Sequence, residues 1–100
     1  MTDNSITSST RKKYRQIGHH LRPIVTVGNS GITGGVIDEM QRALRDHELI
    51  KVKVGQGSEI DRKEGAAELA QSTKAHLAGV IGRVWILYRP DPEEPRIQLD

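Results

Sequence analysis

The chain contains no cysteine and no phenylalanine, and aromatic residues make up only 3% of its sequence. Without cysteine it can form no disulfide, no zinc site with thiolate ligands and no catalytic thiol. With so few aromatic side chains, the core of this 100-residue domain has to be aliphatic and small. No apolar run reaches the roughly 20 residues that span a bilayer. The polar start, MTDNSITSST, also lacks the basic-then-apolar order of a signal peptide. We therefore expect a soluble, cytoplasmic protein.

Charge is unevenly distributed along the chain, although the formal net charge is only +2. Between Asp3 and Asp38 there are five basic residues and no acidic one: Arg11, Lys12, Lys13, Arg15 and Arg22. From Val54 onward, six basic residues stand against eight acidic ones. A basic half joined to a mildly acidic half predicts a localised surface for a polyanion.

The segment IVTVGNSGITGG, residues 24–35, combines a short β-branched run, a glycine-bracketed loop and the start of a helix. The loop is Gly28, Asn29, Ser30 and Gly31, and Thr33 can cap the helix that follows. Free amides at a helix start, together with the helix dipole, favour an anion. Two interpretations stay open for the loop by itself. One is a backbone phosphate clamp, like the GXXG loop of KH domains, and the other is an ordinary strand-to-helix turn.

Other glycine-rich phosphate motifs do not fit this segment. A P-loop needs Lys-Ser/Thr after its last glycine, whereas Val36 and Ile37 follow Gly35. The dinucleotide fingerprint needs its first two glycines one residue apart, whereas two residues separate Gly28 from Gly31. Ser30 is not in a nucleophile elbow, because the glycine required at 32 is Ile.

Hydrophobic periodicity and turn signals predict three helices and four strands. The best-specified element is the helix capped by Thr33, and the clearest strand is LIKVKV, in which Lys51 and Lys53 face away from the apolar positions. The remaining expectations are a helix capped by Thr10 and running to about Leu21, a strand at Ile24–Val27, a helix capped by Ser58, a strand at His76–Ile81, a turn at Gly82–Arg83 and a strand at Val84–Tyr88.

The order α-β-α-β-α-β-β predicts an α/β two-layer sandwich with a four-stranded mixed sheet. Right-handed βαβ crossovers give parallel strands, and the final hairpin adds an antiparallel one. The last strand is apolar without a break, so we expect the first helix to cover the second face of the sheet there. Trp85 and Tyr88 are candidates for stacking on nucleobases, although Trp85 is expected in the core.

No catalytic constellation, metal site or cofactor site is predicted. The four histidines are His19, His20, His47 and His76, and no two of them have ligand spacing on one helical face. Acidic pairs such as Glu93–Glu94 stand in a proline-rich segment that cannot hold them rigidly for acid–base chemistry. These patterns favour a binding module.

Three strings taken together resemble one family: GNSGIT with the helix after it, ALRDHELIKVKV, and VIGRVWILYRP. The chain is similar to the CRM (YhbY-like) RNA-binding domain, in its single-domain bacterial form, from about Lys13 to Pro90. The resemblance implies a fold similar to the C-terminal domain of translation initiation factor three. It also implies RNA contact at the glycine-bracketed loop and the basic surface beside it.

The resulting hypothesis is a binding protein for ribosomal RNA in precursors of the large ribosomal subunit, favoured as a monomer without a small-molecule substrate. We expect a disordered extension at 1–9, the CRM-like domain at 10–90 and an acidic, proline-rich tail at 91–100. The alternative is a protein-docking module that uses the Lys51/Lys53 face or the acidic tail. The residues expected to contact RNA are Gly28, Asn29, Ser30, Gly31, Thr33, Arg11, Lys12, Lys13, Arg22, Lys51 and Lys53.

Overall fold

The helices and strands follow one another in the predicted order in the computed structural model, which describes residues 7–93. Expected features that fall on residues 1–6 and 94–100, most of the two terminal extensions, lie outside the described residues. The elements are α1 (Ser8–His19), β1 (Pro23–Val27), α2 (Gly34–His47), β2 (Leu49–Val54), α3 (Arg62–Thr73), β3 (His76–Ile81) and β4 (Val84–Tyr88).

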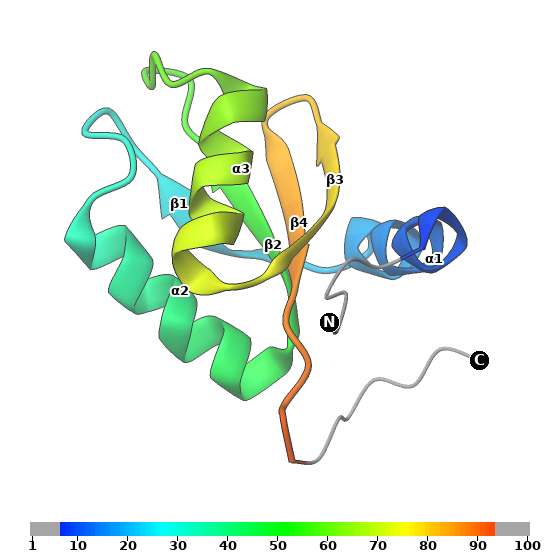
Figure 1. Cartoon of the computed structure of the whole chain (residues 1–100). Coiled ribbons are helices and arrows are strands. Elements are labelled where there is room, and N and C mark those ends of the chain that lie inside the picture. The colour runs from blue at the N-terminus through cyan, green and yellow to red at the C-terminus, as the bar shows by residue number, and fades with distance from the viewer. Residues whose placement is uncertain (1–6, 94–100) are drawn as a thin grey trace.

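The four strands form one mixed sheet in the order β1-β2-β4-β3 (Figure 1). β1 and β2 are parallel, and β4 is antiparallel to both of its neighbours, β2 and β3. β3 therefore runs in the same direction as β2, as the crossover rule predicts, but β4 lies between them. One consequence is that the chain after β1, the chain after β2 and the β3–β4 turn all lie at the same end of the sheet.

The main core lies between one face of the sheet and the helices α2 and α3. Alternate residues of β2, namely Ile50, Val52 and Val54, point into it, as their spacing predicts. Trp85 of β4 also belongs to this core and is fully buried, which confirms the expectation for this residue. The sheet and the layer of α2 and α3 form the predicted two-layer sandwich. Burial of these aliphatic side chains stabilises it by removing apolar surface from water.

Helix α1 covers part of the opposite face, as expected from the unbroken apolar run in β4 (Figure 1). A side chain at Gly18 would collide with Ile86, so the absence of one lets α1 approach the sheet closely. Tyr14 stacks on Tyr88 with ring centroids 3.9 Å apart. Burial, followed by the hydrogen bond with Tyr14, raises the pKa of Tyr88.

Two helix starts differ from the sequence prediction. α1 begins at Ser8 with Thr7 as its cap, because Thr7 Oγ1 accepts the Thr10 amide at 3.1 Å. The disordered extension expected up to Ser9 therefore overlaps a helix. α3 is capped by Asp61, whose Oδ1 accepts the Glu64 amide at 2.8 Å, and not by Ser58. In both helices the capping oxygen comes from a residue other than the one expected, because Thr7 and Asp61 accept the amide hydrogen bond that defines the helix start.

A buried glutamate anchors the chain after β4. Glu48 is fully buried at the end of α2, and its carbonyl oxygen accepts the Arg89 amide at 2.8 Å. Its carboxylate accepts the Asp91 amide at 2.6 Å. The Arg89 guanidinium donates to the Gln41 side chain of α2 and, at 2.8 Å, to the Thr73 carbonyl at the end of α3.

Within residues 7–93, no helix is both long and apolar enough to cross a membrane.

Candidate nucleic-acid interface

The glycine-bracketed loop forms a tight turn directly after β1. The Gly31 amide donates to the Gly28 carbonyl at 3.0 Å, and Gly31 has a φ of +72°. This left-handed conformation is costly for residues with a Cβ, so the turn requires glycine at 31. At Gly28 a Cβ would meet nothing within 4 Å, so neither φ nor space requires glycine there. Asn29 and Ser30 are exposed at the tip.

A second glycine loop, residues 55–57 after β2, packs against the first. The Gly55 amide donates to the Val27 carbonyl at 2.9 Å, which joins the ends of the two parallel strands. A side chain at Gly57 would collide with the amide group of Asn29. The two loops therefore form one surface, although 23 residues separate them in the sequence. We call residues 28–31 and 55–57 the double loop.

The start of α2 adds backbone donors beside the double loop. Thr33 is its cap, as predicted, because Thr33 Oγ1 accepts the Val36 amide at 3.2 Å. The Thr33 carbonyl accepts the Ile37 amide at 3.0 Å. The amides of Gly34 and Gly35, at the start of the first turn, have no acceptor within the helix. Both glycines are exposed, and an added Cβ would meet no backbone at either position, so a ligand has access to this turn.

Two cations lie next to the double loop, Lys53 and Arg83, and only Lys53 was expected from the sequence. Lys53 is exposed on β2, one residue before the pair formed by Val54 and Val27. Arg83, in the β3–β4 turn, reaches the second loop through a 3.3 Å hydrogen bond to the Gly55 carbonyl. Its own carbonyl accepts the Val54 amide at 2.7 Å. The turn was predicted, but its position beside β2 depends on the strand order. Figure 1 shows the turn at the same end of the sheet as both loops.

Other predicted contacts lie away from the double loop. Lys51 donates from Nζ to the His19 carbonyl at 2.9 Å and so holds the C-terminal end of α1. Arg22 is exposed just before β1, at the opposite end of that strand from the loop. Arg11, Lys12 and Lys13 are exposed on the first half of α1. Burial, with Arg11 as a second cause, lowers the pKa of His76. Because His76 begins β3, the α1 cluster lies toward the other end of the sheet.

Buried aromatic rings and the distribution of ligands limit the chemistry of this surface. Tyr88 has 4% and Trp85 0% of its surface exposed, so neither ring is available to stack on a nucleobase, and the suggestion for Tyr88 is wrong. In residues 7–93, no group of three or more His, Asp or Glu side chains is placed to hold a metal ion. What the double loop offers is backbone amides with Lys53 and Arg83 beside them, an arrangement suited to phosphate.

Comparison with known proteins places these features in a wider group. The CRS1/YhbY (CRM) domain matches residues 6–89. A probable RNA-binding protein of Pseudomonas aeruginosa is 39% identical over 89 residues, which cover 89% of this chain and 86% of that protein. An RNA-binding protein of Haemophilus influenzae is 41% identical, with 93% of this chain and 95% of that protein covered.

A solved structure has the same fold. It is the solution structure of a hypothetical protein from Staphylococcus aureus, described there as a candidate RNA-binding protein. The TM-score is 0.82 at 34% sequence identity, covering 95% of this chain and 99% of that one. The match in sequence extends over nearly all of the described residues, and so does the match in fold. The chain therefore belongs to the CRS1/YhbY (CRM) domain family.

Proposed function

We propose that this protein binds RNA without catalysing a reaction, and that its RNA is ribosomal RNA in cytoplasmic precursors of the large ribosomal subunit. The observation that carries the proposal is the double loop. It contains a turn that requires glycine, and the open start of α2 and the cations Lys53 and Arg83 lie beside it. The names of the relatives support RNA as the ligand, and the resemblance noted in the sequence supports ribosome assembly.

The expected binding mode is contact with the backbone of RNA. Loop amides and the first turn of α2 take one phosphate, while Lys53 and Arg83 attract its neighbours. Contacts of this kind fix the position of the RNA without reading its sequence. The cluster of Arg11, Lys12 and Lys13 supplies a second basic surface on α1, which a longer RNA reaches from the loop. Binding then releases counterions at both surfaces, so affinity depends strongly on salt.

The first experiment is a titration of fluorescent single-stranded ribosomal RNA fragments at several salt concentrations. The logarithm of the association constant should fall by about 0.7 per phosphate neutralised for each tenfold rise in salt. The variant Asn29→Asp/Ser30→Asp places two negative charges at the proposed phosphate position. At about 1 kcal/mol per charge in water, affinity should fall about 30-fold.

A matched control carries the same added charge far from the loop. Gln71 and Ser72 are exposed at the end of α3, which is the end opposite the double loop. The affinity of Gln71→Asp/Ser72→Asp for RNA should be within about twofold of the wild-type affinity, once the weak long-range repulsion from the two added charges is subtracted. If the loop variant stays folded and binds like this control, the double loop is not the RNA site.

Ribosomal association is tested separately by sedimentation of cell extracts. We expect the protein to travel with precursors of the large subunit and to be released by ribonuclease. Association that survives removal of accessible RNA would instead favour the second candidate, a protein-docking module. The observation that favours this candidate is the exposed position of Lys53, which belongs to the Lys51/Lys53 face expected to dock a protein.

A further inference from the structure

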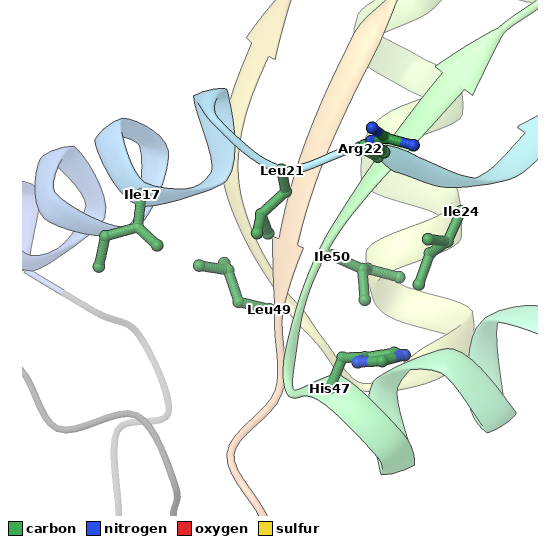
Figure 2. Close-up of a pocket in the computed structure, with 7 residues that line it drawn as sticks. All are labelled: Ile17, Leu21, Arg22, Ile24, His47, Leu49 and Ile50. Atoms are coloured by element: carbon green, nitrogen blue, oxygen red, sulfur yellow. The ribbon is translucent and has the colours of Figure 1, made fainter.

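An apolar groove lies at the opposite end of β1 from the double loop. It is a groove of about 300 Å³ between α1, the start of β2 and the end of α2. Figure 2 shows Ile24, Ile50 and His47 converging on this space, with three aliphatic side chains on the α1 side. Those three are Ile17, Leu21 and Leu49, and Arg22 completes the lining.

The groove exposes apolar surface that most domains cover. Ile17 has 38% and Ile24 43% of its surface exposed, in a chain with few exposed large apolar side chains among its described residues. Among residues 7–93, its floor is also a strand edge without a paired neighbour. β4 pairs with Leu49 and Ile50 on one side, whereas β1 begins only opposite Lys51 on the other. An open edge beside apolar side chains readily accepts another strand.

The position of the chain end points to a particular occupant. The last described residues are held beside the groove, because the Asp91 amide donates to the carboxylate of Glu48, the neighbour of Leu49. The sequence continues from Glu94 as EPRIQLD. Moving from the position of β4 to that of β1 crosses two strand spacings, about 10 Å. The four residue-to-residue steps from Glu93 to Ile97 span up to about 13 Å when extended, so the connection is long enough.

The chemistry of this segment matches the groove. In an extended chain Ile97 and Leu99 fall on one side, while Arg96 and Gln98 fall on the other. Asp100 follows the second apolar residue. The residues lining the groove include two basic groups, Arg22 and His47, and no carboxylate. Apolar pattern, length and charge therefore agree on one arrangement.

We propose that residues 94–100 bind in this groove beside Leu49 and Ile50. Ile97 and Leu99 cover its apolar floor, and Asp100 lies next to Arg22. The segment then acts as a short strand that closes the open edge of β2 and removes Ile17 and Ile24 from water. This proposal concerns the protein's own chain and holds whether or not the double loop binds RNA.

Paramagnetic labelling tests the contact directly in the full chain. Because the sequence has no cysteine, Gln98→Cys offers a single site for a nitroxide label and leaves both apolar residues in place. We expect the methyl signals of Ile17, Ile24 and Leu49 to lose most of their intensity. The methyl signals of Val36, at the start of α2 and thus at the other end of the sheet, should keep theirs.

Two further variants in the labelled protein establish specificity. Ile97→Asp/Leu99→Asp should restore the groove signals, and so should Ile24→Glu, which changes an exposed side chain and leaves the core intact. Broadening that persists in both variants would overturn the proposal, as would its absence from the parent. An isotope-labelled, nitroxide-free protein mixed with nitroxide-labelled protein detects contact between copies. Broadening in the mixture as strong as within one chain would assign the groove to a second copy and overturn the proposal.

Discussion

The side chain of Asn29 occupies the place that a Cβ on Gly57 would take, so the two loops at the end of the sheet are packed against each other. Gly57→Ala should therefore force Asn29 into another rotamer and displace the tip of the first loop. The expected cost is about 1 kcal/mol of unfolding free energy, together with weaker RNA binding. Denaturant unfolding and RNA titration measure the two effects.

A double-mutant cycle checks that the cause is this contact. Asn29→Ala removes the amide group that the new methyl group would strike, so Gly57→Ala should cost less than half as much in that background. Equal costs in both backgrounds would mean that Gly57 is required for some other reason. Gln56→Ala, at the exposed neighbour of Gly57, should leave unfolding unchanged.

The two bracketing glycines of the first loop should respond differently to alanine. Gly31 has a φ of +72°, so Gly31→Ala should destabilise the protein by about 1–2 kcal/mol. Gly28→Ala should change unfolding by no more than about 0.5 kcal/mol, since space is open and its backbone is not left-handed. Asn tolerates the left-handed region, so Gly31→Asn should recover part of the loss. Equal effects at 28 and 31 would contradict this account.

Local pattern was sufficient to predict most of the fold. Alternation in β2, the Thr33 cap and the Gly82–Arg83 turn depend on residues close together in sequence, and each was predicted correctly. The capping errors also had a local cause. Thr7 and Thr10 both have a side-chain oxygen that can cap a helix, and so do Ser58 and Asp61. Residue type alone does not say which oxygen accepts the amide hydrogen bond at the helix start.

The candidate site was harder to predict because it is assembled from distant segments. Arg83 reaches Gly55 only because β4 lies between β2 and β3, and sequence pattern did not specify that order. For the same reason the sequence did not show that the cations of α1 lie away from the loop. Arg11 precedes Gly28 by 17 residues, but it faces His76 at the start of β3. Charge asymmetry along the chain indicated a basic surface without giving its shape.

Arg89 should contribute to stability through the helices that it joins. Its guanidinium donates to Gln41 of α2 and to the Thr73 carbonyl at the end of α3. Lysine keeps the charge but lacks the planar arrangement of donors. Arg89→Lys should therefore cost about 1–3 kcal/mol in denaturant unfolding. Arg83→Lys serves as the matched control and should cost under about 0.5 kcal/mol, because Arg83 is exposed. Equal losses would remove the case for a structural role of Arg89.

Stability should fall on acidification through His76. Burial lowers the pKa of this imidazole from its ordinary value of 6.5, and the charge of Arg11 on α1 lowers it further. Its ring also stacks on that of Tyr88, with centroids 6.3 Å apart. Protonation would therefore add a second positive charge near Arg11 at a partly buried position. As pH falls below 6.5, His76 of the unfolded chain takes up a proton before His76 of the folded protein does. Acid therefore stabilises the unfolded chain relative to the folded protein. The stability lost in this way accumulates until pH passes the lowered pKa of the folded state.

His76→Gln removes the titrating group while keeping a polar side chain of similar size. Unfolding free energies at pH 7.5 and pH 5.5 should differ less in this variant than in the wild type. His20→Gln changes an exposed residue directly after α1. This variant should show the same difference in unfolding free energy between the two pH values as the wild type. If His76→Gln keeps that difference as well, another group causes the loss of stability in acid. If His76→Gln is more stable than the wild type at pH 5.5, protonation of the partly buried imidazole beside Arg11 is what destabilises the wild-type protein in acid.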